Sequence, residues 1–135
     1  MQTVIVTDSK YRSAISAVRA LGRAGYNVVA VQTRGDCSAE PAAFVSRYTA
    51  QPRMIDCSVS DEDYADRLAE VIREYPRPVL FCVGAATLAV VSGRREFFSE
   101  ICDFLIAPPD VLLALNDKEA VHRRAEELGL PVPKE

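Results

Sequence analysis

The sequence has no tryptophan, a single histidine, and no pair of its four cysteines in Cys-x-x-Cys spacing. The missing pair excludes a zinc ribbon or a thioredoxin-like dithiol as the organising feature of the chain. The one histidine, His122, lies in a predicted helix with no cluster of cysteines or carboxylates beside it, which argues against a metal site and against a histidine base. We therefore assign no catalytic residue and no metal ligand to this chain.

Long apolar runs and an excess of positive charge are also missing. No segment reaches the length of a membrane-spanning helix, and the chain opens on Met1-Gln2 without the basic stretch of a secretory signal. These absences predict a cytoplasmic protein with reduced thiols and no membrane partner. The net charge of −3 and the dispersed lysines and arginines argue against a nucleic-acid partner, because binding to phosphates requires a basic face.

Glycine is absent from the turn in which a dinucleotide-binding fold requires it. The first predicted strand is followed by Asp8-Ser9-Lys10-Tyr11-Arg12-Ser13, without G-x-G-x-x-G, and the chain has no Walker A sequence. Those glycines let the backbone approach a pyrophosphate, so their absence disfavours an NAD-dependent enzyme. The same turn lacks the phosphate loop of a flavodoxin. A receiver domain would need an aspartate after the third strand, where Thr49-Ala50-Gln51 is predicted instead.

What the sequence does have is a regular alternation of apolar, β-branched runs and amphipathic stretches. The predicted strands are 3–7, 27–32, 44–49, 79–83 and 104–107, and the predicted helices are 11–24, 61–75, 87–92, 94–100, 111–115 and 118–128. Ser60, Asp110 and Asp117 are the predicted N-caps, and Gly25 is predicted to close the first helix. This order predicts an α/β fold over residues 1–130: a Rossmann-like open parallel sheet of about five strands with helices on both faces. A proline-rich linker is predicted to begin at residue 131.

Ligands of open parallel sheets bind at the carboxyl ends of the strands. The residues predicted at those ends form the candidate substrate site: Asp8, Ser9, Lys10, Arg34 and Gly84. Each also has a structural explanation. Asp8 and Ser9 would suit the cap of the first helix, and a loop lysine or arginine is usually solvated.

Lys118 lies in the first turn of the last predicted helix, next to Asp117. The positive end of the helix dipole disfavours a cation at this position. The same helix end favours a phosphate, whose charge a lysine would complement. These residues support a surface lysine and a phosphate ligand equally well.

The carboxyl-terminal segment resembles a known domain junction. Asn116-Asp117-Lys118, with Gly129-Leu130-Pro131-Val132-Pro133 after the helix, is similar to the point at which ATP-grasp enzymes pass into their ATP-grasp domain. Ser46-Arg47-Tyr48 with Pro52, the strand 79–83 and Pro108-Pro109-Asp110 follow the order of the amino-terminal domain of that superfamily. The resemblance covers essentially the whole chain. It is greatest to the carbamoyl-phosphate-synthase-like and D-aspartate-ligase-like branches.

This resemblance implies the preATP-grasp domain of an ATP-dependent carboxylate–amine ligase that forms an acyl-phosphate intermediate, a domain that lines the substrate cleft. It implies that Lys118 contacts the ATP phosphates, and that ATP and Mg²⁺ are cofactors of the full-length enzyme. The implied partners are small-molecule carboxylate and amine substrates and an ATP-grasp domain that this chain lacks; a homodimer is compatible with the resemblance. We expect the chain to be the front piece of a larger enzyme, to bind no cofactor tightly and to be inactive alone.

The segment after the fourth strand departs from the family pattern. Many relatives carry an acidic residue there, whereas this chain has Gly84-Ala85-Ala86-Thr87, so its substrate can differ. The alternative hypothesis is a stand-alone Rossmann-like module that binds a small molecule. The size of the native polypeptide distinguishes these two hypotheses.

Overall fold

The structure, a computed structural model, describes residues 1–134 and contains two compact units. The first, Met1–Leu105, contains the sheet and is called the sheet unit here. The second begins at Ile106, contains two helices, and is called the helical unit. Each unit is described separately below.

The sheet unit is built on four parallel strands, β1 (Thr3–Val6), β2 (Asn27–Thr33), β3 (Gln51–Ile55) and β4 (Val79–Phe81), in the order β3-β2-β1-β4. In the register, Val4 of β1 lies opposite Val28 of β2 and Val79 of β4. The predicted open parallel sheet is confirmed, with four strands in place of about five.

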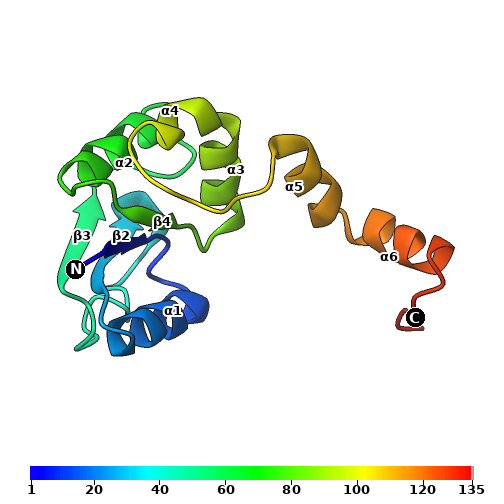
Figure 1. Cartoon of the computed structure of the whole chain (residues 1–135), viewed down its shortest axis with the longest axis horizontal. Helices are drawn as coiled ribbons and strands as arrows, with labels where there is room; N and C mark the ends of the chain where they lie inside the picture. The colour runs from blue at the N-terminus through cyan, green and yellow to red at the C-terminus, as the bar shows by residue number, and fades with distance from the viewer. Residues whose placement is uncertain (135) are drawn as a thin grey trace. The chain divides into compact units, whose positions relative to one another are not determined.

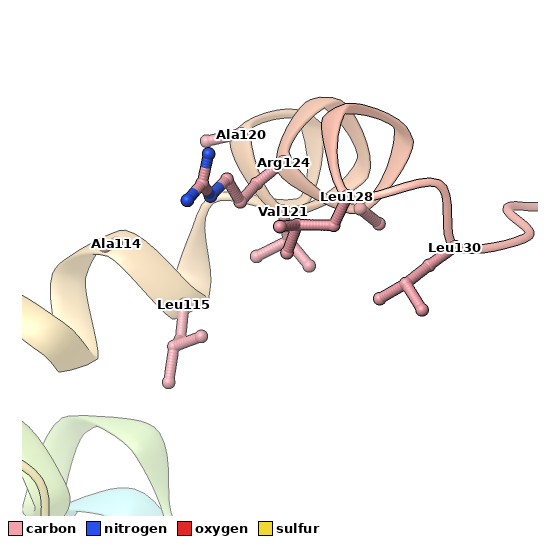
Figure 2. Close-up of a pocket in the computed structure, with 8 residues that line it drawn as sticks. Ala114, Leu115, Ala120, Val121, Arg124, Leu128 and Leu130 are labelled. Atoms are coloured by element: carbon pink, nitrogen blue, oxygen red, sulfur yellow. The ribbon is translucent and has the colours of Figure 1, made fainter.

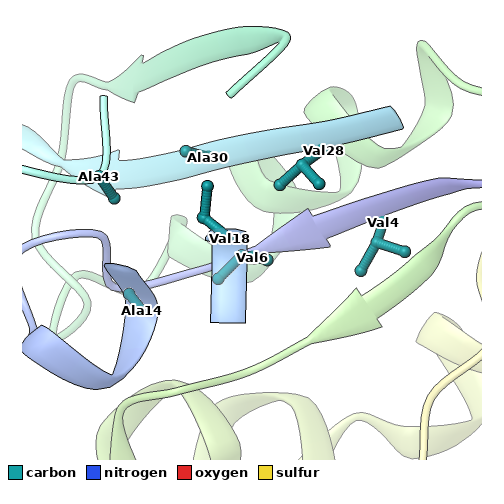
Figure 3. Packing of buried hydrophobic residues seen from close by; sticks show 7 residues of the cluster. All are labelled: Val4, Val6, Ala14, Val18, Val28, Ala30 and Ala43. Carbon is teal, nitrogen blue, oxygen red and sulfur yellow. The ribbon is translucent and has the colours of Figure 1, made fainter. Parts of the chain in front are cut away.

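Helices cover both faces of this sheet, as predicted. Figure 1 shows α1 (Arg12–Arg23) on one face and α2 (Tyr64–Arg73), α3 (Ala85–Gly93) and α4 (Arg95–Ser99) on the other. A short 3-10 helix, η1 (Arg34–Asp36), follows β2. On the α1 side, alternate residues of the strands pack against the helix in a cluster drawn in Figure 3: Val4, Val6, Val28 and Ala30 with Ala14, Val18 and Ala43. The residues between them along the strands point to the other face, which is what an α/β sheet buried on both sides requires.

The predicted third strand, 44–49, is wrong. These residues form turns, in which the Thr49 hydroxyl donates to the Ala43 carbonyl at 2.6 Å. Phe44 and Tyr48 supply the apolar pattern because they pack against the core under α1, not because they lie in a strand. The true strand, β3, begins at Gln51 and includes Pro52. Proline is tolerated there because β3 is an edge strand and needs no hydrogen-bond donor on its outer side.

The predicted fifth strand, 104–107, is also wrong. The chain pairs with β4 at one residue, Asp103, whose carbonyl accepts from the Leu80 amide at 2.8 Å and whose amide donates to the Pro78 carbonyl at 3.0 Å. Beyond this bridge the side chain of Leu105 is fully exposed, so its apolar character contributes nothing to the sheet. A strand needs a continued ladder of such pairs, and here the ladder stops after one.

The helix ends confirm some predicted caps and correct others. Gly25 has a φ of +90° after α1, as its predicted role requires. Ser60 does not cap α2, which begins after Asp63 without a side-chain cap. Asp110 lies inside α5 (Pro109–Asn116), which begins after Pro108 because proline suits the first helical position. Asp117 caps α6 (Lys118–Glu127), and its carboxylate accepts from the Ala120 amide at 3.0 Å.

A tyrosine packed on a helix glycine joins the 43–49 turns to α1. Gly22 leaves room for Tyr48, because a Cβ at Gly22 would lie 2.5 Å from the Tyr48 Cβ. The guanidinium of Arg47 lies 4.8 Å from the centre of the Tyr48 ring and donates to its hydroxyl at 2.7 Å, and that of Arg23 lies 5.9 Å from the ring centre. Two cations therefore meet at one phenol.

This arrangement predicts an acidic tyrosine. Hydrogen bonds from Arg47, and then from Arg23, hold the pKa of Tyr48 below the ordinary value for a tyrosine, because both cations stabilise the phenolate. Ultraviolet titration should resolve one phenol that ionises at lower pH than the other tyrosines. Arg47→Ala should move that step upward, while Arg73→Ala, which removes an arginine near Phe97 instead, should leave it in place. A step unmoved by Arg47→Ala would contradict the assignment.

Candidate functional site

The carboxyl edge of the sheet brings together the predicted site residues of the sheet unit. Asp8 lies two residues after the end of β1, Arg34 directly after β2, and Gly84 three residues after the end of β4. Backbone bonds hold these strand ends side by side: the Thr7 amide donates to the Phe81 carbonyl at 3.1 Å, and the Ser9 amide donates to the Val31 carbonyl at 3.2 Å.

Asp8 is buried at the start of α3, and its carboxylate is fully engaged there. It accepts from the Gly84 amide at 2.8 Å, from the Thr87 hydroxyl at 2.9 Å and from the Thr7 hydroxyl. The Thr87 hydroxyl also pairs with the Tyr64 hydroxyl at 3.2 Å. Asp8 therefore stabilises the first turn of α3, whose amides lack partners within the helix. Its predicted alternative role as a cap of α1 is wrong, because α1 begins after Tyr11 without a side-chain cap.

The backbone at this point is strained and closely packed. Asp8 has a φ of +55°, in the left-handed region that most residues avoid. A Cβ at Gly84 would lie 2.8 Å from the Asp8 Cγ, so only glycine allows the carboxylate to reach the amide. Gly84 is thus part of the frame that holds Asp8.

Ser9 and Lys10 continue this turn toward solvent. The Ser9 hydroxyl is buried and donates to the Val31 carbonyl at 2.8 Å, so it does not cap α1 either. The Lys10 amide donates to the Gln32 side-chain oxygen at 2.9 Å, and its exposed ammonium group donates to the Asp36 carbonyl at 2.8 Å. Lys10 is the residue of this turn whose charged group remains available at the surface.

Two aspartates complete the edge at β2 and β3, and sequence reasoning missed both. Asp56, directly after β3, pairs with Arg34, and this ion pair lowers the pKa of the carboxyl. The Asp36 carboxylate accepts from the Thr33 hydroxyl and from the Val59 amide at 2.8 Å, and the bond from Thr33 is the main reason that its pKa is lowered. The misplaced third strand hid Asp56, because the true β3 ends one residue before it.

Lys118 lies in the helical unit, more than thirty residues after the last of the predicted site residues of the sheet unit, Gly84. It is the first residue of α6, is exposed, and follows the capping residue Asp117. An exposed ammonium group beside the first-turn amides of a helix suits a phosphate.

The helical unit also carries an apolar groove of about 320 Å³ between α5 and α6. Figure 2 shows Leu115, Val121, Leu128 and Leu130 along it, with Ala114, Ala120 and Arg124. Neither helix has a buried residue, and Leu115, which lines the groove, is 62% exposed. We call this surface the α5–α6 apolar face.

Among residues 1–134, no three side chains of histidine, cysteine, aspartate or glutamate are grouped so that they could hold a metal ion. No helix in that range combines the length and the apolar character needed to cross a membrane.

Comparison with solved structures shows the fold. The biotin carboxylase domain of a single-chain bacterial carboxylase aligns with 98% of this chain at a TM-score of 0.66 and 19% identity. The same domain of the Hydrogenobacter thermophilus 2-oxoglutarate carboxylase, a dimer in complex with MgADP, ADP and bicarbonate, aligns with 97% at a TM-score of 0.62 and 16% identity. This chain covers 30% and 28% of those two chains. It therefore has the fold of the matched part of biotin carboxylase domains, and the predicted Rossmann-like fold is confirmed.

Sequence comparison adds a short match of another kind. No protein-family model matches the chain. Nucleoside diphosphate kinases of Chlamydia trachomatis, from serovars D and L2, are 44% identical over 46 residues, which is 34% of this chain and 33% of each kinase. The chain thus spans about a third of the length of the curated relatives it matches, and the kinase activity is not carried over to it.

Proposed function

We propose that this chain is the amino-terminal, preATP-grasp domain of an ATP-dependent carboxylate–amine ligase. The observation that carries the proposal is the alignment of nearly the whole chain with less than a third of biotin carboxylase domains, which are ATP-grasp enzymes. One of those domains is bound to MgADP. The motifs at Asn116-Asp117-Lys118 and Gly129-Leu130-Pro131 favour the same superfamily.

The α5–α6 apolar face supports the proposal independently. Two short helices without a buried residue are marginal by themselves, because helices in proteins are stabilised mainly by packing of an apolar face. Exposed Leu115, Leu128 and Leu130 line one groove and form the kind of surface that a further domain would cover. We propose that the ATP-grasp domain of the full-length enzyme packs on this face.

The proposed roles of the site residues follow from which of their charged groups are exposed and which are already hydrogen-bonded within the protein. Lys118 and the first turn of α6 would contact the ATP phosphates, and Lys10 and Arg34 would face an anionic substrate at the carboxyl edge of the sheet. Asp8, Ser9 and Gly84 would shape that edge, because their polar groups are already bonded within the protein. The magnesium ligands would come from the remainder of the enzyme, since residues 1–134 offer no metal-binding cluster. MgATP, when bound, supplies the phosphoryl group that activates the carboxylate substrate.

We propose that the full-length protein is a cytoplasmic enzyme, that this domain lines its substrate cleft, and that the domain is inactive alone. A homodimer is compatible with this function. An immunoblot for the native protein should find a polypeptide well over twice this chain's 14.8 kDa. The full-length protein should release ADP when a carboxylate and an amine are supplied, and the 135-residue chain should not. A native product near 14.8 kDa would instead favour the stand-alone binding module, and turnover by the short chain would refute its predicted inactivity.

Lys118 provides the residue-level test. In the full-length enzyme, Lys118→Ala should weaken ATP binding about 10- to 100-fold, because a charged hydrogen bond to phosphate is lost. The measurement is the dissociation constant of a fluorescent ATP analogue. Arg123→Ala, an exposed cation elsewhere on α6, is the control and should change binding less than threefold. Equal effects of the two substitutions would remove Lys118 from the nucleotide site.

A further inference from the structure

The first 35 residues of this protein carry a net positive charge, because they contain almost no carboxylates. Residues 1–35 contain five lysines and arginines and a single carboxylate, that of Asp8, which is buried. Residues 36–135 are therefore negatively charged overall, and they account for the net charge of −3 of the whole chain. An asymmetry of this kind marks a surface for a partner of opposite charge.

Three of these arginines share one face of α1. Arg12, Arg19 and Arg23 are seven and four residues apart, which places them within an arc of about 40° around the helix and along about 16 Å of its axis. All three are exposed. The buried positions of the helix, Ala14 and Val18, face the sheet instead.

Arg47 extends this line beyond the helix. The ring of Tyr48, which packs on Gly22, is in contact with the guanidinium groups of both Arg47 and Arg23. The turn and the helix therefore bring their positive charges to the same place. We call Arg12, Arg19, Arg23 and Arg47 the α1 arginine face.

These four cations lack the carboxylate partners that other arginines have. Within residues 1–134 none of them forms an ion pair. Six arginines elsewhere do form one: Arg34, Arg53, Arg67, Arg77, Arg94 and Arg124. The protein thus neutralises its exposed arginines in most places but not on this face.

We propose that the α1 arginine face docks an acidic surface of a partner protein. A line of cations along a helix is complementary to carboxylates that recur along one side of a partner helix. Exposed tyrosines flank α1 at both ends, Tyr11 and Tyr26, and tyrosine and arginine are the residues enriched in protein interfaces. This proposal does not depend on the proposed ligase function.

Two other occupants fit less well. A second copy packed by a twofold axis would place the arginines of one α1 opposite those of the other, and like charges repel. Nucleic acid would meet the negative charge of the remaining surface, since the protein as a whole has a pI near 5.2.

The test uses the 135-residue chain and a fluorescein-labelled helical peptide with glutamates at positions i, i+4, i+7 and i+11. Anisotropy should show saturable binding that weakens at least tenfold between low and physiological salt, because exposed charges are screened. Arg19→Glu should weaken binding at least tenfold. Arg123→Glu, the same charge change on α6, should weaken it less than threefold.

Several results would overturn the proposal. The peptide could fail to bind, or could bind Arg19→Glu as well as the unaltered chain. Duplex DNA of the same length could bind more tightly than the peptide, which would make the face a nucleic-acid surface. Sedimentation could show a dimer that Arg19→Glu dissociates, which would make a second copy the occupant. Circular dichroism of Arg19→Glu checks that the variant is folded, as expected for a substitution at an exposed position.

Discussion

Replacing Asp8 by alanine is expected to lower the free energy of unfolding by about 3 kcal/mol. The carboxylate accepts from one amide and two hydroxyls in the protein interior. Its removal leaves the Gly84 amide at the start of α3 without a partner, and each buried group left unsatisfied costs about 1–3 kcal/mol. Urea unfolding followed by circular dichroism measures the change.

The backbone conformation of Asp8 makes it possible to separate the loss of the carboxylate's hydrogen bonds from the strain of the left-handed conformation. Because φ is +55°, Asp8→Gly should be less destabilising than Asp8→Ala by about 1 kcal/mol, since glycine adopts the left-handed region without strain. Glu62→Ala, at an exposed position in the same unit, is the control and should change stability by less than about 0.5 kcal/mol. An Asp8→Ala variant as stable as Glu62→Ala would show that the buried network contributes little.

The same substitution, glycine to alanine, should have opposite effects at two helix positions. At Gly22, the new methyl group would lie 2.5 Å from the Tyr48 Cβ and 2.8 Å from its ring, so the turn must move, at a cost of about 1–3 kcal/mol. At Gly93, near the end of α3, a Cβ would meet nothing within 4 Å. Gly93→Ala should therefore stabilise the protein by about 0.5–1 kcal/mol through helix propensity alone.

Thermal and urea unfolding of the two variants provide the comparison. Gly22→Ala should also release Tyr48 from its arginines, so its phenol should titrate closer to the ordinary tyrosine value. If Gly22→Ala stabilises the protein as Gly93→Ala does, then Tyr48 does not pack on α1 as described, and the α1 arginine face loses its link to Arg47.

Much of the local structure could be predicted, because its causes lie within a few residues. Strand β1 and helix α1 follow the predicted ranges closely, since a β-branched run and a 3.6-residue apolar period are properties of adjacent residues. The cap at Asp117 and the left-handed Gly25 are local in the same sense. The two wrong strands, 44–49 and 104–107, were apolar stretches whose residues serve other purposes or stay exposed.

The candidate site could be predicted in its location but not in its bonding. The strand order placed Asp8, Lys10, Arg34 and Gly84 at one edge, as a parallel sheet requires. The sequence could not show that Asp8 would bind the start of α3, because its partners Gly84 and Thr87 are 76 and 79 residues away. Nor could it show that β3 is an edge strand that accepts Pro52, since strand order is a property of the whole sheet.

Local periodicity and capping chemistry thus account for the class of the fold and for the order of its helices and main strands. Contacts between residues distant in sequence account for the rest. They are the hydrogen bonds from the start of α3 to the Asp8 carboxylate, the packing of Tyr48 on Gly22, and the convergence of Arg23 and Arg47 on the Tyr48 ring. The reason is physical. Propensity and amphipathicity act over one or two turns of chain, whereas burial, steric contact and charge convergence depend on which surfaces the folded chain brings together.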